Sequence, residues 1–257
     1  MSPPSKWADG PFPLIQTPSA TKDISGHAAH YIANEMAFAH NAMLRGLNAI
    51  YLQAPHVPKK DASDFLFFVA SWSAWVLHHH NLEEANMFPK FEAIPGIKRG
   101  QLSQNIHQHE LFAGGLESLN QYATNTPVDA YEGKRVCELM DAFAHHMTKH
   151  LADEIDTLWA LDCCEMGEEK NLLKIYEDAE TEAGKQDKTV VPPMALGLCD
   201  KTFEGGNSWP AMPPGSAYIV HYLFSRKHRG AWRFLPSDTF RTPRPLAFLG
   251  PEGESAQ

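Results

Sequence analysis

The chain has 257 residues, of which 43% are hydrophobic and 21% are charged. This size and composition predict a globular protein with a packed core, built as one large domain or as one domain with an extension. The formal net charge of −9 argues against nucleic acid and against an anionic membrane as the main partner, so we expect neither.

The N-terminal segment and the cysteines indicate the compartment. Residues 1–23 are rich in Pro and Ser, lack the apolar stretch of a secretory signal, and are expected to form an extended lead-in. No apolar run reaches about 18 residues, so no membrane-spanning helix is expected. The four cysteines form neither a CxxC pair nor an obvious disulfide framework, which favours reduced thiols and a cytoplasmic location.

Four long segments with apolar residues at steps of three or four follow the lead-in. The second begins at Ser63, a plausible N-cap, and its end is marked by Pro89 and the Pro95-Gly96 pair. The helices are expected over about residues 24–52, 63–89, 101–123 and 131–161. Because the links between them are short, the pattern predicts an all-α protein built on an antiparallel four-helix bundle.

The chain changes character after the fourth helix. Residues 167–183 are charged and predict a short fifth helix, so the helical domain is expected to span 24–184. Residues 185–257 are rich in Pro, Gly and aromatic residues, too aromatic for a disordered tail. They predict an irregular extension packed on the bundle, in which residues 218–224 form a short strand or a buried extended segment.

Histidines at helical spacing are the unusual feature of this sequence. The second segment contains His79-x-x-x-Glu83, and the fourth contains His150-x-x-x-Glu154. Residues four apart lie one turn apart on the same helix face, so each pair can bind one metal or two adjacent metals. The first and third segments each offer one inward histidine, His40 and His109. Mixed imidazole and carboxylate ligands suit iron, and also manganese or zinc.

In this order the four motifs resemble those of hemerythrin and the hemerythrin-like proteins of the HHE type. The stretches that carry the resemblance are AHNAMLRGLNAI around His40, HHHNLEEANMFPKFE, QHELFAGGL around His109, and HLADEIDTL after His150. The resemblance covers about residues 24–162. The extension beyond it resembles extensions of hemerythrin-like proteins from filamentous fungi.

The resemblance implies an up-down-up-down bundle that holds two irons per chain. Glu83 and Glu154 would bridge the irons. The terminal ligands would be His40, His79, His109 and His150.

Two positions depart from the oxygen-carrying members of that family. Those members have HxxxH on the third helix, and here Asn105 stands four residues before His109. They also carry the fourth-helix carboxylate five residues after its histidine, where this chain has Ile155, with Glu154 one position earlier as in the broader HHE group. The departures suggest a site with one histidine fewer.

Two alternatives remain open within the site. His80 and Glu84 have the same spacing as His79 and Glu83, but that register would turn Ser73 inward, so we favour the 79/83 register and keep His80 and Glu84 as additional or alternative ligand candidates. His146 lies one turn before His150 and is an additional or replacement ligand candidate.

The sequence leads to two hypotheses of function. The first is an oxidoreductase that activates O2 at the iron pair and acts on a small organic substrate, because fewer protein ligands leave more open coordination positions. The extension would then roof a substrate pocket. The second is a non-catalytic carrier, sensor or store that binds O2, nitric oxide or iron, as the best-known members of the family do with O2.

Overall fold

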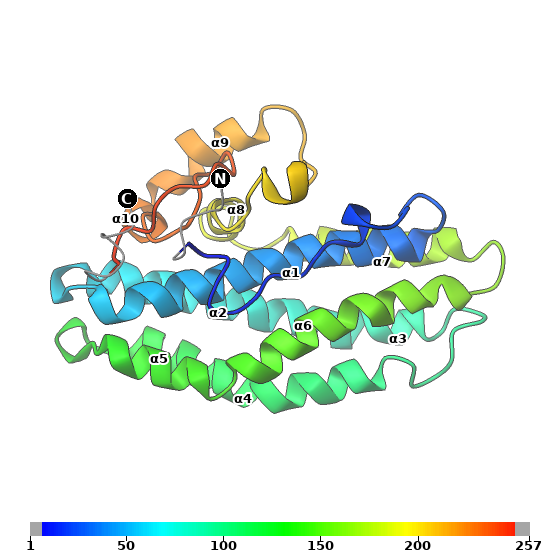
Figure 1. Ribbon diagram of the computed structural model, residues 1–257, viewed down its shortest axis with the longest axis horizontal. Helices are drawn as coiled ribbons and strands as arrows, with labels where there is room; N and C mark the ends of the chain where they lie inside the picture. The colour runs from blue at the N-terminus through cyan, green and yellow to red at the C-terminus, as the bar shows by residue number, and fades with distance from the viewer. Residues whose placement is uncertain (1–6, 250–257) are drawn as a thin grey trace.

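The computed structural model describes residues 7–249, so residues 1–6 of the predicted lead-in and 250–257 of the predicted extension lie outside it. Four long helical segments form an antiparallel bundle (Figure 1). They are α1 (Ala28–Gln53), α2 (Ala62–Leu82), α4 (Ser103–Asn125), and the pair α5 (Gly133–Asp141) and α6 (Ala144–Trp159). Between residues 7 and 249 the only β-type pairing is a single bridge between Ser237 and Pro243. The predicted all-α bundle is confirmed.

Buried positions repeat at steps of three and four along the bundle helices, as a shared core requires. On α4 the buried face consists of Asn105, Gln108, His109, Phe112, Leu116, Leu119 and Ala123. Polar and apolar residues thus share one inward stripe. In the bundle α1 packs against α6, and α4 packs against both α2 and α6.

The predicted second helix continues beyond α2 with a change of winding. Residues Glu83–Met87 form a π-helix, and α3 (Phe88–Phe91) follows it directly. A 3-10 segment, Lys59–Asp61, precedes α2, which begins one residue earlier than expected. The other 3-10 segments are Pro18–Ala20, Ala54–His56, Val128–Ala130, Ala160–Cys163, Phe203–Gly205 and Phe224–Arg226.

The fourth predicted helix is in fact two helices, a correction to the expected continuous span of 131–161. The chain leaves helical geometry at Phe143, where φ is −130° and ψ is −21°. Phe143 is buried there against α4, and a Cβ placed on Gly115 would lie 2.6 Å from the Cβ of Phe143. The break therefore coincides with the close approach of α4, which a glycine at position 115 permits.

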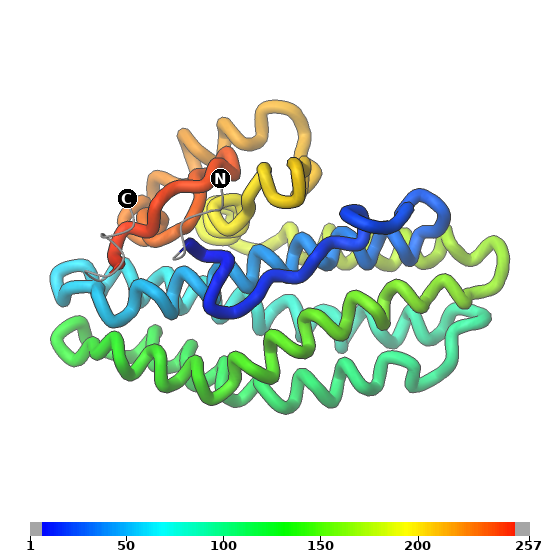
Figure 2. The backbone as a smooth tube through the Cα atoms, in the orientation of Figure 1, coloured from blue at the N-terminus to red at the C-terminus, as the bar shows by residue number. Residues whose placement is uncertain are grey.

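The lead-in is held along α1 by three asparagines spaced seven residues apart. Asn34 accepts a hydrogen bond from the backbone of Ser19, and Asn41 pairs with both backbone groups of Ile15. Asn48 accepts from the amide of Phe12 and donates to its carbonyl. Because seven residues make about two helical turns, the three amides lie in one row along α1. The lead-in runs along that helix (Figure 2).

The predicted fifth helix is present as α7 (Glu169–Ala183), which packs against α1. Three short helices follow in the extension, α8 (Val191–Gly197), α9 (Ser216–Tyr222) and α10 (Arg229–Trp232). The extension lies over α1 and α2, away from α4 and α5 (Figure 1).

Side chains of the extension join the bundle core. Phe234 is fully buried, with its ring centroid 5.0 Å from that of Phe65 and 6.4 Å from that of Phe68. The side-chain amide of Gln53 donates to the carbonyl of Phe234 at 2.8 Å. The ring of Trp209 stacks on that of Phe38, with centroids 6.3 Å apart. Phe38 lies two residues before His40 along the chain. The segment boundaries at residues 24 and 185, and a roof over the site, stay predictions.

Residues 218–224 were expected as a strand or a buried extended segment, and this expectation is wrong. They belong to α9 and to the turn that follows it. Gly215, with a φ of 86°, is the N-cap of α9. Tyr218 and Tyr222 stack with centroids 6.4 Å apart and are 61% and 59% exposed. The two rings, one helical turn apart, pack against each other in α9. The β-branched and aromatic composition of this segment, which favours a strand, therefore did not determine its secondary structure.

Within residues 7–249 no helix combines the length and the apolar character that crossing a membrane requires.

Candidate metal centre

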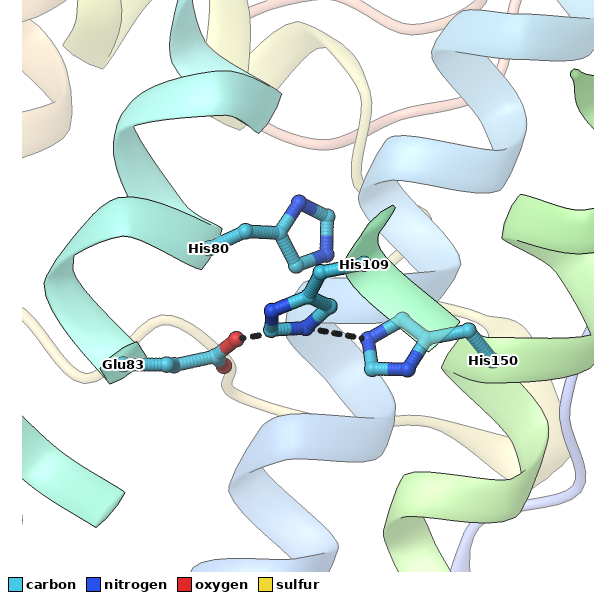
Figure 3. A group of neighbouring side chains, drawn as sticks. All are labelled: His80, Glu83, His109 and His150. Carbon is cyan, nitrogen blue, oxygen red and sulfur yellow. Dashed lines mark hydrogen bonds and ion pairs between the residues drawn. The ribbon is translucent and has the colours of Figure 1, made fainter. Parts of the chain in front are cut away.

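The six ligand residues predicted from the sequence come together inside the bundle. Two groups of closely spaced ligand atoms result, one from His80, Glu83, His109 and His150 and one from His40, His79 and Glu83. Figure 3 shows the first group, with the His109 ring between Glu83 and His150. Since Glu83 belongs to both groups, the two possible metal positions are adjacent.

The remaining distances connect the two groups. Oε2 of Glu154 lies 3.6 Å from Nε2 of His40 and 3.3 Å from Nε2 of His150. Nε2 of His79 lies 2.8 Å from Oε1 of Glu83 and 3.4 Å from Nε2 of His40. Glu83 and Glu154 therefore each contact a histidine of both groups, as bridging carboxylates would.

The second helix presents both His79 and His80 to this centre, so the two sequence registers were not exclusive. The expected objection to the second register also disappears. Ser73 is fully buried, but its hydroxyl donates to the carbonyl of Val69 at 2.8 Å and accepts from the amide of Asn120 at 2.9 Å. The inward face of α2 is thus wide enough for two neighbouring histidines.

Glu84, the carboxylate of the alternative register, lies outside the centre. Its Oε1 accepts a hydrogen bond from Nδ1 of His109 at 2.6 Å. The π-helix begins at Glu83, three residues after His80. A π-turn holds one extra residue, which lets neighbouring positions share an inward face, and such turns recur at functional sites.

His146 does not join the site, which corrects its candidacy as an additional ligand. Its side chain is exposed, whereas Met147, His150 and Glu154 are buried. At 3.6 residues per turn, a residue four positions earlier is rotated by about 40°. His150 lies at the edge of the buried arc of α6, and that rotation carries His146 into solvent.

Hydrogen bonds outside the centre fix how three of the histidines are protonated. Nδ1 of His40 donates to the carbonyl of Leu151 at 2.8 Å, and Nδ1 of His109 donates to Glu84. Nδ1 of His150 lies 3.3 Å from Oε1 of Gln108, whose amide nitrogen donates to Asp153 and so fixes the amide orientation. In the neutral form each ring then carries its proton outside, and Nε2 offers a lone pair to the centre.

Two of these lone pairs face each other across a short distance. Nε2 of His109 lies 3.0 Å from Nε2 of His150 (Figure 3). If both rings are neutral with Nδ1 protonated, no hydrogen lies between these atoms. A cation bound by both nitrogens removes the repulsion, which is the usual role of imidazoles held this way.

Unpaired polar atoms gather at the same place. Among the residues that the structure describes, thirteen buried side-chain nitrogen or oxygen atoms lack a hydrogen bond of normal geometry. Eight of them belong to four residues here, namely His80, Glu83, Asn105 and Glu154. Leaving buried polar groups unpaired costs free energy, and buried carboxylates are tolerated when they are paired or bind metals. The donor set therefore fits a cationic metal.

Burial keeps four of the imidazoles in the neutral state that a metal ligand requires. It lowers the pKa of His40 to about 3 and that of His79 to about 4. Burial, reinforced by neighbouring imidazoles, also holds the pKa values of His80 and His150 well below the ordinary value. Burial, and then repulsion from the second carboxylate, raises the pKa of Glu83 well above its usual range. These four imidazoles are thus neutral and able to ligate, and the carboxyl group of Glu83 lacks a compensating cation.

The comparisons with known proteins agree with this geometry. Residues 31–161 match the model of the Hemerythrin HHE cation binding domain. The chain is also similar to "Dimeric xanthone biosynthesis cluster protein R11" of Cryptosporiopsis sp. (strain 8999), with 36% identity over 97% of this chain and 95% of that protein. The chain belongs to the hemerythrin family. Its similarity to the fungal relative runs past residue 161 through most of the extension. No solved structure matches the chain.

The site also has features that the sequence motifs did not predict. His80 was predicted only as an additional or alternative ligand, and the hydrogen bonds that the Nδ1 atoms of His109 and His150 donate to Glu84 and Gln108 were not predicted. A signal was available, because Gln108 directly precedes His109 and Glu84 directly follows Glu83. Which side chains those neighbours meet depends on tertiary packing, which no helical period reports.

Proposed function

We propose that this protein binds two iron ions inside the bundle and uses them to bind and activate O2 as an oxidoreductase acting on a small organic substrate. The observation that carries the proposal is the pair of inward Nε2 atoms of His109 and His150, 3.0 Å apart with their Nδ1 atoms bonded outward. The unpaired oxygens of Glu83 and Glu154 beside them supply the negative charge that a cation pair requires.

Each metal position has its own set of residues in this proposal. His40 and His79 would hold one iron, and His80, His109 and His150 the other, with Glu83 and Glu154 between them. When bound, the iron pair supplies the redox chemistry, and the side chains hold and orient it. The Nδ1 atoms of His40, His109 and His150 bond to a carbonyl, a carboxylate and an amide oxygen, respectively. These bonds fix the three rings in the orientation that a metal ligand requires.

The enzymatic part of the proposal draws on the relative. Its printed name places it in a biosynthesis cluster for dimeric xanthones, which are aromatic compounds. A similarity that spans 97% of this chain includes the extension as well as the helical domain. We therefore propose an aromatic molecule as the organic substrate class.

A second function, reversible binding of a diatomic molecule without catalysis, is favoured by the enclosure of the site. The side chains of His40, His150 and Glu154 are 0% exposed, and His79 is 18% exposed. A diatomic molecule is small enough to reach such an enclosed site, whereas an aromatic substrate needs the bundle surface to open beside His79.

Reaction with O2 separates the two functions. Protein loaded anaerobically with ferrous iron and then exposed to air is expected to oxidise irreversibly, with faster consumption of O2 in the presence of the aromatic substrate. The measurements are optical spectra through repeated cycles of air and degassing, together with O2 uptake. Full recovery of the ferrous spectrum on degassing would favour the carrier, and an iron content below one per chain would contradict both functions.

His79→Ala and His80→Ala are each expected to reduce the iron content from two per chain towards one. The reason is that each removes one imidazole from a different metal position. Metal analysis after gel filtration measures this, and His146→Ala, which changes an exposed histidine, is the control. Two irons retained by His80→Ala would remove His80 from the ligand set and restore the single 79/83 register.

A further inference from the structure

The site consists of two layers along the bundle, one turn apart. The first layer holds the histidines from all four helices. The second layer lies one helical turn from the first, and each of the four helical segments contributes one buried residue to it. Those four residues are Met36 on α1, Glu83 after α2, Asn105 on α4 and Glu154 on α6.

The direction follows from the topology of the bundle. Met36 and Asn105 come four residues before His40 and His109, on α1 and α4, which run in one direction. Glu83 and Glu154 come four residues after their histidines, on helices that run in the opposite direction (Figure 1). Residues four apart lie one turn apart on one helix face, so all four belong to the same layer.

Asn105 is therefore in the layer of the two carboxylates. It is 1% exposed, and neither its amide nitrogen nor its amide oxygen has a hydrogen-bond partner among residues 7–249. The next buried polar residue on α4, Gln108, has partners for its amide in Asp153 and His150, whereas the Asn105 amide has none. A buried amide without partners costs free energy, and a hydrophobic side chain of the same size would avoid that cost.

We propose that Asn105 is the binding group for one small exogenous ligand, a diatomic molecule or small anion, that enters the carboxylate layer beside the metal held by His80, His109 and His150. The inference rests on the proposed iron site. The carboxylate oxygens of that layer are committed to the metals, so the Asn105 amide is the group left to donate a hydrogen bond to such a ligand.

Azide titration of the iron-loaded, full-length protein tests this assignment. Asn105→Leu keeps a similar volume and removes both hydrogen-bonding atoms, and Gln104→Leu changes the exposed neighbour on α4 as a matched control. We expect Asn105→Leu to retain two irons and to bind azide about 10- to 100-fold more weakly, the effect of losing a hydrogen bond to a charged group. Gln104→Leu is expected to match the wild type in both respects.

Each outcome decides the assignment. Azide affinity unchanged in Asn105→Leu overturns it and leaves the amide with ordered water only. Loss of an iron from Asn105→Leu also overturns it, because the residue is then a metal ligand. A melting temperature of the metal-free variant equal to or above that of the metal-free wild type excludes a folding defect. Wild-type protein that takes up no iron contradicts the proposed function itself, a result distinct from either.

Discussion

Glu83→Ala and Glu154→Ala are each expected to abolish tight iron binding, lowering the affinity by more than about 100-fold, beyond what the loss of an outer hydrogen bond to a ligand costs. Each carboxylate contacts histidines of both metal groups, and both are almost fully buried. Removing one takes away a shared ligand and one of the two negative charges that offset the cations. Iron content after dialysis against a weak chelator measures the loss.

The control for these variants is Glu110→Ala. The Glu110 side chain is 70% exposed and pairs with His107 on the surface of α4, so its removal is expected to leave two irons bound. Glu83→Gln, which fills the same volume, separates loss of charge from loss of packing. Either bridge variant that keeps two irons with an unchanged spectrum would show that its carboxylate is not a bridge.

Stability without metal gives an independent check on the same variants. In the metal-free wild type, Glu83 is a buried carboxyl group without a hydrogen bond of normal geometry. Ligands that bind only the folded state add stability by mass action, so ferrous iron is expected to raise the melting temperature of the wild type and not that of Glu83→Gln. The metal-free Glu83→Gln protein is expected to be at least as stable as the metal-free wild type, because it buries a less costly group.

The helical spacing of the sequence predicted both the bundle and the inward positions of six ligand candidates. Both predictions depend only on steps of three and four residues within single helices. The choice between His79 and His80 could not be made that way. A single inward direction was assumed for α2, whereas its buried arc includes Ser73 as well as Val76, and a π-helix follows directly at Glu83. That winding change is a property of the folded helix and has no periodic signature.

Features that depend on contacts between two helices could not be predicted from the spacing within either helix. The break at Phe143 reflects the close approach of Gly115 on α4, and the hydrogen bond between Glu84 and His109 joins residues 25 positions apart. The exposure of His146 depends on where the buried arc of α6 ends, which its partner helices determine. Asn105 was recognised as a departure from the family, but its unpaired amide appears only when its neighbours are known.

Phe234→Ala is expected to destabilise the protein by about 3–5 kcal/mol, the usual cost of removing a fully buried aromatic ring. The ring lies in the core of the bundle, against Phe65 and Phe68 of α2, although the residue belongs to the extension. Two backbone groups of the extension are also hydrogen-bonded to α1, because Gln53 donates to the carbonyl of Phe234 and accepts from the amide of Phe248. Urea unfolding of the metal-free protein measures the change.

The matched control is Tyr222→Ala, since Tyr222 is an aromatic residue of the same extension and is 59% exposed. Its removal is expected to change stability by no more than about 0.5 kcal/mol. Iron content should stay at two per chain in both variants, because neither ring contacts a ligand residue. If Phe234→Ala unfolds at the wild-type urea concentration, the extension does not unfold together with the bundle. In that case a chain ending at Gly184 should be as stable as the full-length protein, and the extension would have no structural role from which to cover the site.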